Sequence, residues 1–244
     1  MAKTKTRPLD AALLGIAAMC LLAAAVIFGT FLAEDAAYRS LAGDAATSSG
    51  VSDGQAVDWE SLSAINPDIA AWLRVDGTRI DYPVVKPGEG KAGDWYLSHD
   101  FWGNPNPIGC LYLDRRSSAD GPHALVYGHH MELSGQMFHD ISGAYGQTAF
   151  DAVGAAHWLT PTGDEEFAPA LSMRVDKGYA PIQRFEFEDA ADLRMWLEGL
   201  AGDATAKSPD LDDLTKRARR ALTLVTCSSA FAGERARTLL VFVA

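Results

Sequence analysis

The sequence predicts a mostly β domain with a closed antiparallel sheet, attached to one N-terminal membrane-spanning helix. Three observations lead to this fold class. Short β-rich runs, separated by turn residues, recur from residue 71 to the end of the chain. An apolar run without charges fills residues 11–33. Beyond that run, helical periodicity is confined to short segments.

The composition is that of a globular protein with a sizeable core. Of the 244 residues, 48% are hydrophobic and 9% are aromatic. The formal net charge of −11 disfavours any function that requires binding to nucleic acid phosphates. The three cysteines are an odd number, so we expect no disulfide framework and at least one free thiol.

Residues 11–33 form the predicted membrane anchor. These 23 residues, at 1.5 Å per residue in a helix, can cross a hydrocarbon core of about 30 Å. A cleaved signal peptide usually has a shorter apolar region of about 7–15 residues, so we favour an uncleaved anchor. Basic residues precede the run and predict a cytoplasmic N-terminus, residues 1–10, with the rest of the chain outside the cell: Lys3, Lys5 and Arg7.

The anchor is followed by a predicted flexible stalk over residues 34–57. This stretch is rich in Ala, Gly, Ser and Asp and contains too few large apolar residues to fold alone. The ordered domain is expected to span residues 58–244. It should begin with a short helix over Asp58–Ile65, because apolar residues recur there at helical spacing.

The strands of the domain are read from apolar runs that Gly, Pro and acidic turns interrupt. We expect strands at residues 71–75, 80–85, 110–113, 124–127, 155–159, 171–175, 184–187, 221–226 and 238–243. Because the chain ends on a strand, the last element is expected inside the sheet rather than as a tail.

Two helices are expected between the predicted strands at residues 184–187 and 221–226. The first covers Asp189–Leu200, where four apolar residues share one helical face: Leu193, Trp196, Leu197 and Leu200. The second is expected to begin at Ser208 as its N-cap, with Pro209 at the first helical position. Its basic residues, within 216–220, match the negative end of the helix dipole and need no ligand to explain them.

Residue types suited to nucleophilic catalysis lie at strand ends. Cys227 closes the predicted strand 221–226, and His129 and His130 follow another strand. Near the start of the last strand, Arg235 and Arg237 share one face by alternation, and Arg237 is nearer to the apolar run. A thiolate can attack a carbonyl carbon, an imidazole can move the proton, and a guanidinium can stabilise the oxyanion. Together they would catalyse acyl transfer through a thioester.

Other interpretations of the same residues are open at this stage. A strand cysteine is often only a small buried hydrophobe, and paired histidines can be half of a metal site. A zinc hydrolase would use His129, His130 and Cys227, but no acidic residue stands at a ligand-like spacing from the histidine pair. A membrane-tethered β-barrel without catalytic activity, acting as a binding module, is the alternative to an enzyme.

Several separated stretches resemble the sortases, specifically those of class B. The two signature stretches are YGHHM (127–131) with GQMF (135–138), and TLVTC (223–227) with Arg237 ten residues after the cysteine. Upstream stretches agree in order and spacing: NPDIAAWL (66–73), IDYPVV (80–85), WYL (95–97) and GCLYLD (109–114). The resemblance covers the chain from Trp59 to its end.

The resemblance implies a fold and a set of site residues. The family has an eight-stranded β-barrel, with N-terminal helices and a helical insertion before the strand of the catalytic cysteine. By position, Cys227 resembles the nucleophile, His129 the acid/base residue and Arg237 the residue that stabilises the oxyanion or orients the substrate. The resemblance makes Cys110 a structural cysteine. It places four residues at substrate-binding positions: Val85, Val225, Thr226 and Ser228.

The resemblance also implies the reaction and its partners. Sortases cleave a sorting signal near the C-terminus of an exported surface protein after its Thr, in Gram-positive cells. They transfer the acyl group to an amine of a peptidoglycan precursor or of a pilin Lys. No cofactor and no metal are expected. Val225 and Ser228 depart from the residues usual at their positions, which bears on peptide preference rather than on the chemistry.

Overall fold

The computed structural model describes residues 8–47, 57–228 and 235–244. The chain forms two compact units, Met1–Leu41 and Ala42–Ala244, and each is described by itself.

A single long helix, α1 (Pro8–Thr47), contains the predicted anchor. Its stretch Ala12–Gly43 is long and apolar enough to cross a membrane. The helix continues through residues 34–47, where a flexible stalk was expected. This segment is rich in alanine, which has the highest helix propensity of all residues. It therefore forms a helix although it contains few large apolar residues. The rest of the expected stalk, residues 48–56, lies outside the described residues.

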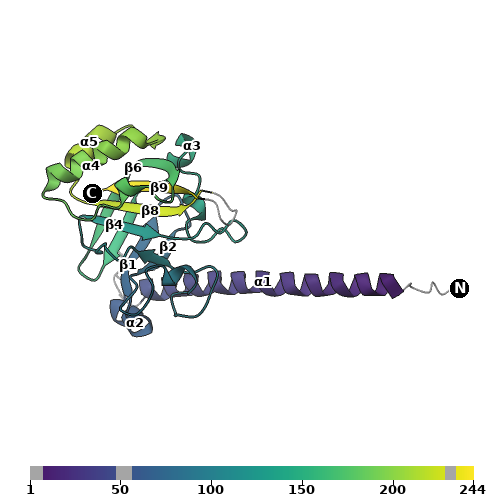
Figure 1. The fold of residues 1–244 in the computed structure, drawn as a ribbon. Helices are drawn as coiled ribbons and strands as arrows, with labels where there is room; N and C mark the ends of the chain where they lie inside the picture. Colours follow the sequence, from purple (N-terminus) through teal and green to yellow (C-terminus); the bar gives the residue numbers. More distant parts are fainter. Residues whose placement is uncertain (1–7, 48–56, 229–234) are drawn as a thin grey trace. The chain divides into compact units, whose positions relative to one another are not determined.

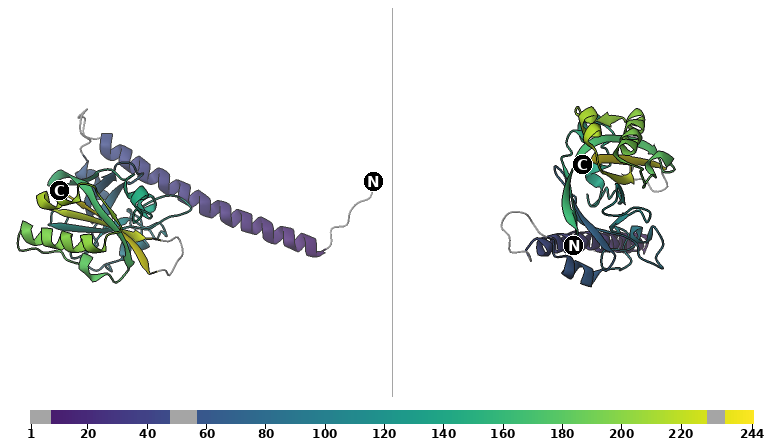
Figure 2. Two further views of the ribbon diagram at one scale, coloured as in Figure 1. Left: turned by 90° about the horizontal axis from the view of Figure 1, so that it is seen from above. Right: turned by 90° about the vertical axis from the view of Figure 1, so that its left-hand side faces the viewer.

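The second unit is built around a closed β-barrel (Figures 1 and 2). Eight strands pair in a ring, and the ring closes because β6 pairs with β5, so the predicted eight-stranded barrel is confirmed. In the order of pairing the strands are β5 (Ala156–Thr160), β1 (Ile69–Val75), β2 (Asp81–Val85), β3 (Leu111–Leu113), β4 (His123–Tyr127), β8 (Ala221–Cys227), β9 (Ala236–Val243) and β6 (Gly163–Asp176). A two-residue strand, β7 (Ala206–Lys207), pairs with β6 outside the ring.

Most ring pairs are antiparallel, and two are parallel. The parallel pairs are β2 with β3 and β4 with β8. Large side chains fill the core, and the largest of those that are fully buried include Trp72, Trp158, Phe167 and Phe242. Closing a sheet in this way removes its exposed edges and leaves a rigid frame for the loops at each end.

The predicted helical insertion is present between β6 and β8, as α4 (Ala190–Asp203) and α5 (Leu211–Arg217). The two helices lie side by side on one side of the barrel (Figure 1). The four apolar residues predicted to share a face of α4 are all buried in a cluster with barrel residues. The helix α5 starts at Leu211 rather than after Ser208, because Asp210 is its N-cap and the Ser208 hydroxyl accepts the Asp210 amide instead (3.2 Å).

The expected strand at residues 184–187 is wrong. Arg184 pairs with Asp192 of α4, and its guanidinium lies over the Phe187 ring, 4.7 Å from the centroid. The Phe187 ring is in turn 5.3 Å from that of Trp196. The alternating side chains of residues 184–187 therefore pack against the helix α4, and these residues form no ladder of backbone hydrogen bonds with a strand.

Short helices connect the other elements. The first, α2 (Trp59–Ile65), is the short helix expected over Asp58–Ile65, and the Asp58 carboxylate accepts the Ser61 amide (3.0 Å) as an N-cap. The remaining short helices are η1 (Trp95–Leu97), η2 (His139–Ile141), α3 (Gln147–Phe150) and η3 (Ala180–Ile182).

Candidate active site

The register of three strands brings the ends of β4, β8 and β9 together. In the parallel pair, Tyr127 lies opposite Val225, so both strands end at the same side of the barrel. In the antiparallel pair, Cys227 lies opposite Arg237. Side chains that are direct partners across antiparallel strands have Cβ atoms about 4.5–5.5 Å apart. His129, two residues beyond Tyr127, follows β4 at this same end.

A cavity of about 280 Å³ opens where these strands end, and we call it the cleft. His129, Cys227 and Arg237 all line it, and each is half-buried. The residues that line the cleft are Leu97, Tyr112, Tyr127, Gly128, His129, Lys177, Val225, Thr226, Cys227 and Arg237. Arg235, which immediately precedes β9, instead forms an ion pair with Asp176 (2.7 Å).

The orientation of His129 is set by a backbone carbonyl. Its Nε2 lies 2.8 Å from the carbonyl oxygen of Leu97. Because a carbonyl only accepts, Nε2 carries the proton, and Nδ1 is the atom of the neutral ring that can exchange a proton. The backbone of His129 is held as well, since its carbonyl accepts the Phe138 amide (2.9 Å).

Gly128 is required by close packing at the end of β4. A Cβ atom at this position would lie 2.4 Å from Cδ2 of Leu111 and 2.7 Å from the Phe138 ring. The Gly128 amide also donates to the carbonyl of Val225 (3.1 Å). A glycine therefore lets the backbone that leads to His129 pack closely against Leu111 and Phe138.

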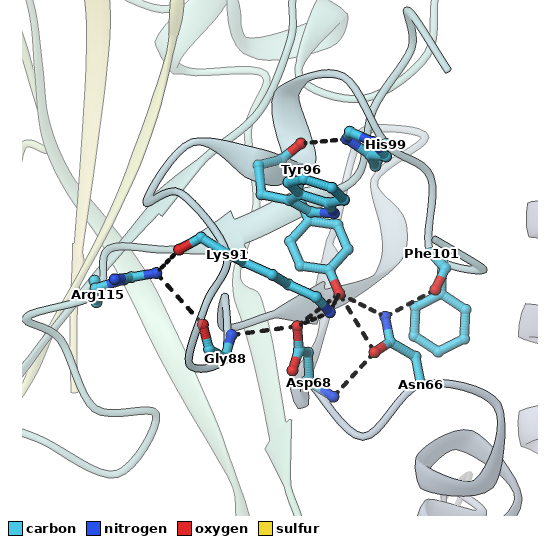
Figure 3. Close-up of polar contacts among 9 residues, drawn as sticks. Asn66, Asp68, Gly88, Lys91, Tyr96, His99, Phe101 and Arg115 are labelled. Atoms are coloured by element: carbon cyan, nitrogen blue, oxygen red, sulfur yellow. Dashed lines mark hydrogen bonds and ion pairs between the residues drawn. The ribbon is translucent and has the colours of Figure 1, made fainter. Parts of the chain in front are cut away.

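Next to Leu97, the helix η1 is held by a polar network (Figure 3). The neighbouring Tyr96 is fully buried; its hydroxyl donates to the Asp68 carboxylate (2.8 Å) and accepts from the Asn66 amide (3.0 Å). Lys91 completes the network through an ion pair with Asp68 (2.5 Å). Burial acts to raise the pKa of Asp68, but the hydrogen bonds from Lys91 and Tyr96 outweigh it, so the pKa lies below its usual value.

Two tyrosines form an aromatic wall of the cleft. The rings of Tyr112 and Tyr127 stack with centroids 5.2 Å apart, and the Tyr127 hydroxyl donates to Asp114 (3.1 Å). Burial raises the pKa of both phenols. At neutral pH they are therefore uncharged, and they offer the cleft a neutral aromatic surface rather than a negative charge.

The four expected substrate-binding residues separate into two groups. Val225 and Thr226 line the cleft. Val85 is fully buried in β2, and Ser228 accepts a hydrogen bond from Arg174 (3.1 Å); neither lines the cleft.

None of the three cysteines forms a disulfide. Cys110 is buried next to β3, and its thiol donates to the carbonyl of Pro83 at 3.6 Å. This packing fits the structural role expected for it.

Several residues of the cleft were missed from the sequence. Leu97, Tyr112, Tyr127 and Lys177 line it, and none was a candidate. Tyr127 could have been found, since it opens the stretch that carries the histidines. The others come from elements far away in the sequence, and only the strand pairing brings them here.

An acidic partner of the histidine pair was also missed. The Glu132 carboxylate lies 2.7 Å from Nε2 of His130, so the expectation that no acidic residue accompanies the pair was wrong. A tight turn, in which the Gly135 amide donates to the Met131 carbonyl (2.7 Å), folds this segment back on itself. Neither His130 nor Glu132 lines the cleft.

Comparison with known sequences points to one kind of protein. No protein-family model matches the chain. It is 26% identical over 185 residues to sortase B of Staphylococcus aureus, covering 75% of this chain and 72% of that protein. It is 32% identical over 82 residues to sortase B of Listeria monocytogenes, a stretch that covers 33% of this chain and 32% of the relative.

Solved structures agree with the sequence comparison. Clostridium perfringens sortase B is similar with a TM-score of 0.64 at 27% identity, over 75% of this chain and 97% of that chain. Staphylococcus aureus sortase B is similar in fold with a TM-score of 0.70 at 23% identity, over 86% of this chain and 97% of that chain.

The cleft combines a nucleophile, the Cys227 thiol, with a group that can carry a proton, the His129 imidazole, and a cation, the Arg237 guanidinium. A half-buried thiol, an imidazole whose Nε2 is already engaged, and a guanidinium share one cavity with a neutral aromatic wall. This combination is suited to attack on a carbonyl carbon.

Proposed function

Since the chain belongs to the class B sortases and is a cysteine transpeptidase, we propose that Cys227, His129 and Arg237 are its catalytic residues. The observation that carries this proposal is that these three residues, from separate strand ends, line one cleft. We further propose that the enzyme cleaves a C-terminal sorting signal after a Thr and transfers the acyl group to an amine.

The acylation step begins with the thiol of Cys227. His129 accepts the thiol proton at Nδ1, and the thiolate attacks the carbonyl carbon of the Thr residue in the sorting signal. The guanidinium of Arg237 stabilises the oxyanion of the tetrahedral intermediate. When the intermediate collapses, the C–N bond breaks, the imidazolium gives its proton to the leaving amine, and a thioester remains on Cys227.

Transfer follows the same path in reverse. An amine attacks the thioester carbonyl while His129 takes a proton from it, and the C–S bond breaks as Cys227 regains its proton. The acceptor is an amine of a peptidoglycan precursor or of a pilin Lys. A structure of Staphylococcus aureus sortase B with a substrate, and a structure of sortase B with triglycine, support a peptide donor and an amine acceptor.

The place of action that we propose is the outer face of the cell membrane. The apolar stretch of α1 supports a single membrane anchor, and Lys3, Lys5 and Arg7 before it favour a cytoplasmic N-terminus. The catalytic unit is then extracellular, where exported surface proteins and cell-wall precursors meet it.

The test is a transfer assay with the full chain in detergent. A panel of sorting peptides with Thr at the cleavage position is incubated with triglycine or with a Lys peptide, and products are identified by mass spectrometry. We expect cleavage and transfer by the parent and by Cys20→Ala, but neither by Cys227→Ala. Loss of activity in His129→Ala is also expected. Turnover by Cys227→Ala would refute the proposed nucleophile.

A further inference from the structure

We propose that His130, Glu132 and His139 form a binding site for a divalent transition-metal cation such as Zn²⁺. The three side chains belong to the segment that follows His129, and none of them lines the cleft. Each offers one ligand atom, and these three atoms all lie within 4.8 Å of one another.

The distances between the ligand atoms are close to those of a metal site. Oε2 of Glu132 lies 2.7 Å from Nε2 of His130 and 3.7 Å from Nδ1 of His139. Ligands at about 2.0–2.1 Å from a tetrahedral Zn²⁺ are separated from one another by about 3.3 Å. The two distances lie on either side of this value, and all three ligand atoms lie within 4.8 Å of one another, so modest rotations of the exposed Glu132 side chain and of the two histidine rings would admit the ion.

Unpartnered polar atoms gather in the same segment. Within residues 130–139, five buried side-chain atoms have no hydrogen-bond partner among the described residues: Nδ1 of His130, Oγ of Ser134, Nε2 and Oε1 of Gln136, and Nδ1 of His139. Only 6% of the His130 side-chain surface is exposed. Buried polar atoms are rarely left unpaired, and one of these five, Nδ1 of His139, is itself a proposed ligand atom that a bound ion would satisfy.

The backbone holds the ligands near one another before any ion binds. His130 and Met137 form an isolated antiparallel bridge, which brings the two ends of the segment together. Next to His139, Asp140 is fixed by an ion pair with Arg79 (2.6 Å). Because the segment is already closed, binding of a cation loses little further conformational freedom.

The ligand types select the class of ion. Two imidazoles and one carboxylate suit Zn²⁺ and other borderline metals, whereas Ca²⁺ and Mg²⁺ prefer oxygen ligands alone. Glu132 and His139 keep 57% and 28% of their side-chain surface exposed, so an ion can reach the site from solvent. Three protein ligands leave a fourth position for water.

Zn²⁺ binding to the full chain in detergent tests the proposal, by competition with a chromophoric chelator. All measurements use the Cys227→Ser background, which removes the thiol of the cleft as a competing ligand. The test variants are Glu132→Gln and His139→Gln. The matched control is His157→Gln, because His157 also pairs with a carboxylate, Asp76 at 3.1 Å, but lies outside the cluster.

We expect one Zn²⁺ per chain, bound at least roughly tenfold more weakly by each test variant and unchanged in the control. Zn²⁺ should also raise the melting temperature of the background protein but not that of His139→Gln. Circular dichroism without metal shows whether each variant is folded. Absence of stoichiometric binding, or equal binding by folded test variants and control, would overturn the proposal.

Discussion

At the scale of single residues, the cleft depends on strand pairing rather than on proximity in the sequence. Cys227 faces Arg237 across the β8–β9 ladder, and His129 enters from the end of β4. The alternation of side chains along a strand predicted that Arg235 and Arg237 share one face. In the structure only Arg237 lines the cleft, because Arg235 forms an ion pair with Asp176. The catalytic candidates were predictable through the resemblance, whereas Tyr112 and Lys177 were not, since the register that brings them to the cleft involves distant segments.

Replacing Arg237 by Lys tests the role of its guanidinium. We expect kcat to fall by roughly 10²–10³-fold with a smaller change in KM, because a lysine does not reproduce the planar donor geometry at the oxyanion. Steady-state kinetics of sorting-peptide cleavage give both constants. Arg235→Lys is the control and should keep the parent's kcat. Equal losses in the two variants would argue against a specific role for Arg237.

Gly128→Ala tests the tight packing at the end of β4. Its Cβ would overlap Leu111 and the Phe138 ring, so we expect a loss of about 1–3 kcal/mol in the free energy of unfolding and a lower kcat. Gly199→Ala in α4 is the control, because its Cβ has open space and a helical Gly→Ala change stabilises by about 0.5–1 kcal/mol. Urea unfolding measures both. Equal stability of the two variants would contradict the tight packing described for Gly128.

At the scale of elements, the predicted order of strands and helices was largely right, and the errors have physical causes. The stretch 184–187 alternates like a strand but packs against α4 through Arg184 and Phe187. The expected stalk is helical as far as Thr47, because its alanines favour a helix, and its two large apolar residues, Tyr38 and Leu41, are buried. In both cases the local pattern was compatible with two structures, and sequence periodicity does not report on the neighbouring element.

His123 links β4 to β8 and to the segment before α4. Its Nε2 lies 2.9 Å from the Thr223 hydroxyl, its Nδ1 lies 2.7 Å from the Arg184 carbonyl, and its ring contacts that of Trp196 at 4.7 Å. Burial lowers the pKa of His123 from 6.5 to about 4. The folded state therefore holds a neutral ring at a pH where the unfolded chain takes up a proton.

This shift predicts acid sensitivity. Stability from His123 is fully present above pH 6.5 and is lost as the pH falls toward 4, which amounts to about 2 kcal/mol between pH 7 and pH 5. The carboxyls with lowered pKa act only at lower pH: Asp68, Asp114, Asp140, Asp176 and Asp192. Urea unfolding at both pH values measures the loss. It should be smaller in His123→Gln; an equal loss in that variant would rule out His123 as its origin.

At the scale of the whole molecule, the chain combines a closed barrel with an apolar helix. Pairing of β6 with β5 closes the ring and gives the loops around the cleft a rigid frame. The number of barrel strands followed from the family resemblance, whereas the order in which they pair was not predicted, because turn signals indicate strands but not their partners. The apolar length of α1 was predictable directly, since crossing a bilayer depends on length and composition alone.

The proposed membrane anchor predicts where the protein is found. We expect the full chain to sediment with membranes and its catalytic unit to be degraded by protease added to intact protoplasts. A variant lacking residues 1–33 should be recovered in the soluble fraction, because it has lost the apolar span. Immunoblots of the fractions, with a cytoplasmic protein as the control for lysis, record the result. Full protection of the catalytic unit in intact protoplasts would contradict the proposed orientation.

The most direct test that Cys227 is the nucleophile is to trap the acyl-enzyme. The full chain in detergent is mixed with sorting peptides without an amine acceptor, quenched in acid, and analysed by intact and peptide-level mass spectrometry. We expect a thioester adduct on Cys227 that hydroxylamine removes and that Cys227→Ala never forms. An adduct on another residue, or peptide cleavage without any Cys227 thioester, would contradict this role of Cys227.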